Sequence, residues 1–223
     1  MPKPWSLFIP PYSIIGMLLI LLGSGWTMAY ADSGNTGAFK PASVQRLQAW
    51  QSLLLDLRNQ PELQQLQQVN RFFNEHIRYT EDAELWNVSD YWASPRETLE
   101  QGAGDCEDFA LAKYFTLREL GVPTEHLRLV YTTLAHNGQA HMVLALWPTP
   151  GHEALVLDNL DVDVKPLSQR QDLSVQFAFD AQHIYRLERN DLRPVAKADL
   201  LPTWHALLQA VPSAELTLAQ LQP

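Results

Sequence analysis

The sequence predicts one compact domain that combines N-terminal helices with an antiparallel β-hairpin. Apolar residues recur at spacings of three and four in the first half of the chain and again from residue 106, and strand-like apolar runs begin at residue 127. The chain has 223 residues, 46% of them hydrophobic, which is enough for one core and too short to require two domains. Its formal charge of −9 argues against a nucleic-acid partner, because phosphate binding needs clustered Lys and Arg.

The N-terminal segment differs from the rest of the chain and has the features of a secretory signal. Lys3 is its only charged residue, residues 14–22 are apolar, and residues 29–31 are the Ala-Tyr-Ala of a small-residue cleavage site. We therefore expect this segment, residues 1–31, to be removed on export, and residues 32–223 to form a single exported domain. The alternative is an uncleaved membrane anchor, but glycines and polar residues make this stretch a poor span.

Periodic apolar residues predict the helices. We expect helices over residues 42–60, 63–77 and 106–120, each with apolar side chains on one side. Residues 84–105 are aromatic and rich in Gly and Pro, which indicates an irregular loop. A weaker helical pattern covers residues 204–211. The third helix therefore begins directly after a loop, at the only cysteine of the chain.

Three apolar runs predict strands at residues 127–133, 140–147 and 154–158. The last two flank a Pro- and Gly-containing loop and should form an antiparallel hairpin. If that hairpin is centred near its Thr-Pro pair, His141 lies opposite Asp158, and directly opposed residues have Cβ atoms about 4.5 to 5.5 Å apart. A register shift of one residue would turn the two side chains to opposite faces, so the contact is a testable geometric prediction.

Cys106 is a candidate nucleophile. It is the only cysteine, so the chain forms no internal disulfide even though an exported protein is in an oxidising compartment. A helix N-terminus favours the thiolate, His141 can take the thiol proton, and Asp158 can orient that histidine. The alternatives are a buried, inert cysteine and a core histidine beside a strand-end aspartate. Spacing alone does not decide between these interpretations, since geometry and not sequence position defines a triad.

Acidic residues surround the candidate nucleophile. Asp105, Glu107 and Asp108 should raise the pKa of the neighbouring thiol, so something has to offset their charge. A calcium ion could do so, because it takes carboxylate and carbonyl oxygens as ligands. Acidic residues in a first helical turn also complement the helix dipole without any metal, and from composition alone this second interpretation is favoured.

A family resemblance rests on longer motifs. The residues that carry it are Val69-Asn70, Phe72-Phe73-Asn74, Trp86, Asp90-Tyr91-Trp92-Ala93, Pro95, Glu97, Gly104-Asp105-Cys106-Glu107-Asp108-Phe109-Ala110, His141-Met142-Val143-Leu144-Ala145 and Leu157-Asp158-Asn159-Leu160. Through them, residues 42–190 closely resemble the bacterial transglutaminase-like cysteine proteinases, in particular the LapG-type periplasmic proteases. The resemblance implies a papain-like, transglutaminase-like α+β fold, with N-terminal helices packed on an antiparallel sheet. It also implies a Cys–His–Asp triad made of Cys106, His141 and Asp158.

The same resemblance implies a cofactor, a substrate and a partner. It implies a calcium-dependent periplasmic endopeptidase in which Asp105 and Glu107, and with less support Asp108, hold Ca²⁺, which reverses the preference for the metal-free interpretation. The expected substrate is the N-terminal region of a large surface adhesin, cut beside a paired alanine so that the biofilm disperses. The expected regulator is the periplasmic domain of an inner-membrane cyclic-di-GMP receptor. Two alternatives remain, an acyl transferase that uses the same triad and a non-catalytic calcium-binding adaptor.

Overall fold

The computed structural model describes residues 41–148, 152–188 and 191–211, all of which fall within the unit Phe39–Pro223. The expected signal segment and the tip of the predicted hairpin lie outside these described residues. The helices are α1 (Pro41–Leu57), α2 (Glu62–His76), α3 (Asp82–Leu85), α4 (Pro95–Gln101), α5 (Cys106–Glu119) and α6 (Pro202–Ala210), with 3-10 turns at Thr124–His126, Leu167–Gln169 and Ala198–Leu200. None of the helices in the described part of the chain is long and apolar enough to cross a membrane.

The strands form one large antiparallel sheet and one small parallel pair. The strands are β1 (Arg78–Tyr79), β2 (Ala103–Gly104), β3 (Leu127–Leu134), β4 (Ala140–Leu146), β5 (Leu155–Leu157), β6 (Lys165–Pro166), β7 (Leu173–Phe179), β8 (His183–Glu188) and β9 (Asp191–Lys197). Strands β1 and β2 pair in parallel, and the remaining strands have the order β6-β5-β4-β3-β7-β8-β9 with every neighbouring pair antiparallel.

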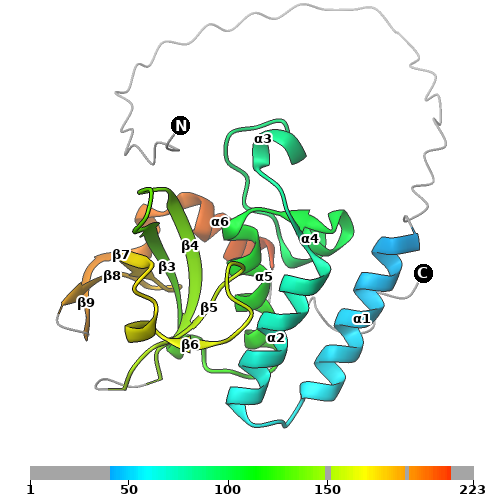
Figure 1. Ribbon diagram of the computed structural model, residues 1–223, viewed down its shortest axis with the longest axis horizontal. Coiled ribbons are helices and arrows are strands. Elements are labelled where there is room, and N and C mark those ends of the chain that lie inside the picture. The colour runs from blue at the N-terminus through cyan, green and yellow to red at the C-terminus, as the bar shows by residue number, and fades with distance from the viewer. Residues whose placement is uncertain (1–40, 149–151, 189–190, 212–223) are drawn as a thin grey trace, which may run out of the picture. The chain divides into compact units, whose positions relative to one another are not determined.

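The N-terminal helices pack on this sheet through α5. Helix α5 contacts β3 and β4, α2 contacts α5 and β5, and α1 contacts α2 and α4, so the helices lie together beside the sheet in Figure 1. Strand β4 is buried from both sides: Met142 and Leu144 belong to the core shared with the helices, whereas Val143 and Ala145 belong to a second apolar cluster. This explains why β4 appears in the sequence as a continuous apolar run. The predicted α+β architecture is confirmed.

Helix α4 lies inside the segment that the sequence analysis assigned to an irregular loop. Ser94 is its N-cap, Pro95 occupies the first turn, and the Glu97 carboxylate accepts the Ser94 backbone N–H at 2.9 Å, which completes a capping box. The helix ends at Gly102, whose φ of +64° is the left-handed conformation that glycine adopts without strain. Proline here begins a helix, and the loop prediction was wrong for these residues.

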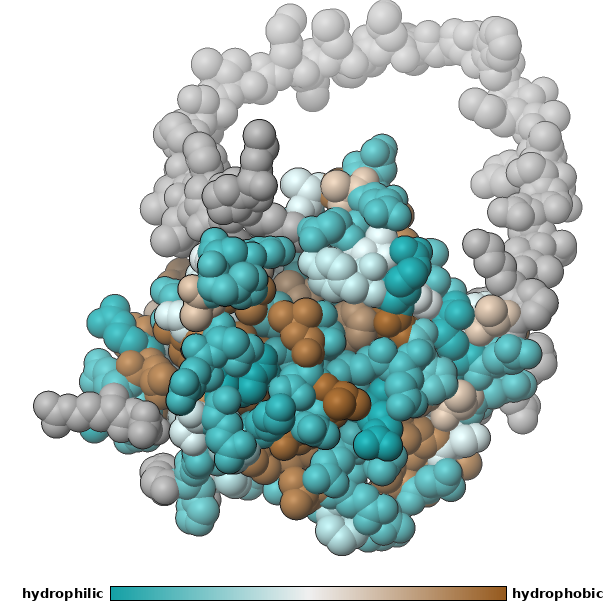
Figure 2. All heavy atoms as spheres, viewed as in Figure 1, coloured by the Kyte–Doolittle hydropathy of each residue, from teal (hydrophilic) through white to brown (hydrophobic). Residues whose placement is uncertain are grey.

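The face of the molecule drawn in Figure 2 is mainly hydrophilic. Figure 2 shows hydrophobic residues on the viewed face as small patches among hydrophilic ones, as on most monomeric proteins. The apolar residues of α2 lie on its buried side as predicted, among them Leu66 and Val69, except for Leu63 in the first turn, which is 52% exposed.

Candidate active site

The chain enters the candidate site from β2, and Cys106 is the first residue of α5, as predicted. Asp105 is the N-cap residue, and its backbone N–H donates to Asp108 Oδ2 at 3.3 Å. The preceding Gly104 makes this approach possible, since a Cβ added there would lie 2.6 Å from the same oxygen. Glycine at this position therefore lets the strand pass directly over the first turn of the helix.

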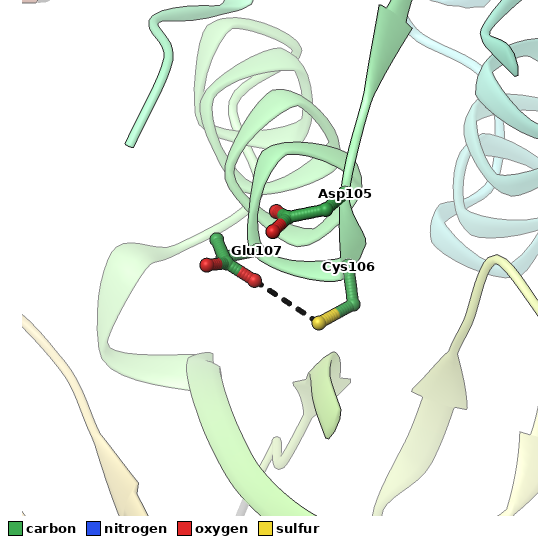
Figure 3. A group of neighbouring side chains, drawn as sticks. All are labelled: Asp105, Cys106 and Glu107. Carbon is green, nitrogen blue, oxygen red and sulfur yellow. Dashed lines mark hydrogen bonds between the residues drawn. The ribbon is translucent and has the colours of Figure 1, made fainter. Parts of the chain in front are cut away.

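The Cys106 thiol faces a carboxylate of its own helix. Its Sγ donates to Glu107 Oε2 at 3.0 Å, and Figure 3 shows Asp105 beside this pair at the helix N-terminus. Burial raises the pKa of the Cys106 thiol well above its usual range, and the negative charges of Glu107 and Asp105 raise it further, whereas a hydrogen bond from the Met142 backbone N–H lowers it. Burial and these two carboxylates therefore favour the neutral thiol, although Cys106 lies at a helix N-terminus.

His141 and Asp158 are in contact. His141 Nε2 lies 2.8 Å from Asp158 Oδ1, and the two residues are 4% and 1% exposed. The register of the hairpin differs from the prediction by two residues, because β4 and β5 pair Leu144 with Leu157 and Ala145 with Val156. A shift of two residues keeps both side chains on the same face, so they meet as diagonal neighbours just beyond the end of β5.

Arg170 is a further partner of Asp158. Its Nη2 lies 2.5 Å from Asp158 Oδ2, and the Leu160 backbone N–H donates to Asp158 Oδ1 at 3.0 Å. Burial by itself would raise the pKa of Asp158, but the hydrogen bonds from His141, Leu160 and Arg170 outweigh it and hold that pKa well below its usual range. Asp158 is therefore an ionised carboxylate that faces a histidine on one side and a guanidinium on the other.

The acidic residues near Cys106 form a compact oxygen-rich group. Asp82, at the start of α3, has a carboxylate oxygen within 4.8 Å of those of Asp105 and Asp108, and the three side chains are buried. Glu107 makes a similar group with Asp82 and Asp90. Such a concentration of hard oxygen donors suits Ca²⁺, which takes several carboxylate ligands.

Asp108 has a clear structural role within this group. Its Oδ1 accepts the Ala93 backbone N–H at 2.8 Å and its Oδ2 accepts that of Asp105, so it ties the preceding loop to the helix. Burial and the nearby charges of Asp105 and Asp82 raise its pKa to about 8. Carboxylates whose charges raise the pKa of a neighbouring carboxylate in this way form a favourable site for a cation, because a divalent ion would relieve the repulsion.

Asp82, Asp90 and Arg170 were not predicted as site residues. The two aspartates lie in or beside the segment interpreted as an aromatic loop, and acidic residues in loops carry no spacing signal of their own. Strand β6 and a 3-10 turn separate Arg170 from Asp158 in the chain, and the fold brings the two side chains together. A buried arginine of this kind is found from the fold and not from the local pattern.

A half-buried cysteine at a helix N-terminus, packed against a strand whose histidine contacts a buried aspartate, defines a cysteine peptidase with a transglutaminase-like fold. The family of bacterial transglutaminase-like cysteine proteinases matches residues 48–184, and the chain belongs to this family. A comparison with curated proteins found no match.

Solved structures agree with this assignment. The chain is similar to Legionella pneumophila LapG, with 38% identity, a TM-score of 0.67, and coverage of 78% of this chain and 92% of that one. A calcium-bound structure of Legionella pneumophila LapG has 37% identity and a TM-score of 0.68 over 78% of this chain and 93% of that one. An EGTA-treated structure of Legionella pneumophila LapG has 36% identity and a TM-score of 0.68 over 78% of this chain and 92% of that one.

Proposed function

We propose that this cysteine peptidase is a calcium-dependent endopeptidase that hydrolyses peptide bonds with Cys106 as nucleophile, His141 as general base and Asp158 as the residue that orients the base. The observation that carries the proposal is the contact of His141, on the strand β4 that packs against α5, with Asp158, just beyond the end of β5. Cys106 and the His141 strand also meet directly, through the Met142 backbone N–H.

The geometry supports these proposed roles. Because His141 Nε2 faces Asp158, its Nδ1 is the nitrogen that takes the proton from the Cys106 thiol. The sulfur then bonds to the scissile carbonyl carbon, and the Cys106 backbone N–H, at the first turn of α5, is placed to donate to the developing oxyanion. His141 passes its proton to the departing amine, which leaves a thioester. Water, deprotonated by the same nitrogen, hydrolyses the thioester and regenerates the thiol.

Calcium is the proposed cofactor. Asp105 and Glu107, joined by Asp82, are the residues that would hold it, and Asp108 would support them through the hydrogen bond that it accepts from the Asp105 backbone N–H. When bound, Ca²⁺ supplies positive charge beside the nucleophile and so offsets the surrounding carboxylates. The calcium-bound relative supports this proposal.

The biological setting is proposed from the family resemblance. The enzyme would act in the periplasm on the N-terminal region of a large surface adhesin, beside a paired alanine, and release the adhesin so that the biofilm disperses. The periplasmic domain of an inner-membrane cyclic-di-GMP receptor would hold it inactive. The apolar segment at residues 14–22 supports export.

The test is cleavage of an adhesin N-terminal fragment by the mature protein, with calcium, with EGTA, and with Cys106→Ala. We expect cleavage only when the wild type is supplied with calcium, and Cys106→Ala should stay folded and inactive. A labelled primary amine added to the reaction separates hydrolysis from acyl transfer, since stable amine incorporation without chain cleavage would replace the peptidase by a transferase. Unchanged cleavage by Cys106→Ala would overturn the mechanism, and calcium binding by a protein that never cleaves would support the adaptor alternative.

A further inference from the structure

A buried polar cluster lies beneath the loop that carries Asp158. It consists of Asn70 and Asn74, one turn apart on α2, and of Lys113 on α5. Asn70 and Lys113 are both 0% exposed, yet the proposed chemistry uses none of the three side chains. Burying an ammonium and two amides is unfavourable unless their hydrogen bonds are satisfied, so the arrangement of those bonds shows what the cluster does.

Lys113 fixes the orientation of both amides. Its Nζ donates to Asn70 Oδ1 and to Asn74 Oδ1, each at 2.8 Å. An amide can present either its oxygen or its nitrogen to a neighbour, but an ammonium only donates, so both amide oxygens must face Lys113. The two amide nitrogens therefore point the other way, toward the loop.

The amide nitrogens hold the backbone of residues 158–162. Asn74 Nδ2 donates to the carbonyl oxygens of Asp158 at 2.7 Å and of Asp161 at 3.2 Å. Asn70 Nδ2 donates to the carbonyl oxygens of Asp161 and Val162, each at 3.0 Å. This backbone lies beyond the end of β5, where no ladder hydrogen bonds fix it.

We propose that Lys113 is a positioning residue for the reaction: it aligns the Asn70 and Asn74 amides, which hold the 158–162 backbone so that the Asp158 carboxylate meets His141. The inference rests on the proposed function, because it concerns the residue that orients the base. Burial lowers the pKa of Lys113 to about 7, and the charge of Asp158 raises it. A neutral amine still has two N–H groups, enough for both amide oxygens, so the alignment survives loss of the proton.

The test compares Lys113→Met, Asn74→Leu and Asn70→Leu with a matched control. Gln65→Met is that control, because Gln65 also lies buried on α2 but its amide donates to the Leu57 carbonyl oxygen at 3.1 Å, away from the loop. We expect Lys113→Met and Asn74→Leu to lower kcat by about 10- to 100-fold with KM changed less than about 2-fold, since small misplacements of a reacting group have effects of this size. Asn70→Leu, which loses no bond to Asp158 itself, should have the smaller effect.

A second readout does not depend on catalysis. The His141 ring N–H that faces Asp158 should give a slowly exchanging downfield proton signal in the nitrogen-labelled protein. We expect this signal to exchange faster in Lys113→Met and Asn74→Leu and to be unchanged in Gln65→Met. If the signal is lost in Lys113→Met and Asn74→Leu while the wild type cleaves nothing, the positioning role stands and the peptidase proposal falls.

Two outcomes would overturn the positioning role. One is an unchanged His141 signal, with kcat equal to that of the wild type, in folded Lys113→Met and Asn74→Leu. The other is a fall in kcat in Gln65→Met as large as theirs, which would mean that any loss of stability in α2 impairs the site. If Lys113→Met fails to fold, Asn74→Leu decides the question, because Asn74 is only partly buried.

Discussion

Replacing Arg170 with methionine should destabilise the protein far more than removing the other carboxylate that Arg170 binds. The Arg170 side chain is 3% exposed, and it pairs with Asp158, whose side chain is 0% exposed, and with Asp172, whose side chain is 49% exposed. Breaking a buried ion pair by removing one partner leaves an uncompensated charge and costs about 3 to 5 kcal/mol. An ion pair with a half-exposed partner contributes about 1 kcal/mol or less.

We expect Arg170→Met to lower the free energy of unfolding by about 3 kcal/mol, the lower end of this range. Asp158 keeps its hydrogen bonds to His141 and to the Leu160 N–H, and the cost of burying the guanidinium disappears with it. Asp172→Ala is the matched control, because it removes one partner of Arg170 and leaves the buried pair intact. Its cost should stay below about 1 kcal/mol.

Urea unfolding followed by tryptophan fluorescence measures both variants, since Trp50 and Trp204 are 1% and 0% exposed and report on the core. The folded-state pKa of Asp158 is depressed, so its stabilisation is fully present above the unfolded pKa and is lost as the pH falls through the folded one. The difference in the free energy of unfolding between Arg170→Met and the wild type should therefore have its full size at neutral pH and become smaller below about pH 4. Equal costs for the Arg170 and Asp172 variants at neutral pH would refute the reasoning.

Three further predictions concern the site itself. Asp158→Asn should lower kcat by about 10⁴-fold in peptide cleavage assays, because a neutral amide no longer holds the correct tautomer of the base. Gly104→Ala should lower the free energy of unfolding by about 1 to 3 kcal/mol in urea titrations, because the new Cβ would lie 2.6 Å from Asp108 Oδ2. Calcium at about 100 times its Kd should stabilise the wild type by about 2.7 kcal/mol, seen as a rise in Tm that EGTA reverses. Glu107→Gln should lose most of that rise, and Glu153→Gln, away from the acidic group, should keep it.

Each of these predictions has a contrary outcome. Near-normal kcat in Asp158→Asn would mean that the contact with His141 is structural. A Gly104→Ala protein as stable as the wild type would show that the hydrogen bond between Asp105 and Asp108 adjusts without loss. A Tm that ignores calcium and EGTA, or a Glu107→Gln variant that responds like the wild type, would remove the metal site from Glu107.

The parts of the fold that the sequence predicted are those with a local signal. Helix α5 was placed at Cys106 because a Gly-rich turn precedes a helical apolar pattern, and the structure begins the helix there. Helix α4 had a signal too, Ser94-Pro95 followed by Glu97, but proline was interpreted as a helix breaker and not as a first-turn residue. The strands after residue 170 were missed because β8 and β9 are half-exposed and mix polar with apolar residues.

The site was predictable to the extent that strand geometry determines it. The His141–Asp158 contact survived a register error of two residues, because the period of a strand is also two. No comparable rule could have found Arg170 or Asp82, since Asp82 reaches the site from the short helix α3 and Arg170 from the residue after a 3-10 turn. Their contribution depends on how the chain returns to the site, which local pattern does not encode.

The position of Asp158 explains why so many buried polar groups gather around it. A residue within a strand is held by its ladder hydrogen bonds, but Asp158 lies one residue past the end of β5 and has none. Arg170 therefore holds its side chain, and Asn74 holds its backbone. Apolar groups could fill the same space and would remove the desolvation cost, but they could not set the direction of a carboxylate. We infer that the buried polar groups around Asp158 serve alignment as well as stability, so Lys113→Met and Asn74→Leu should lower kcat, whereas Arg170→Met should also lower the free energy of unfolding.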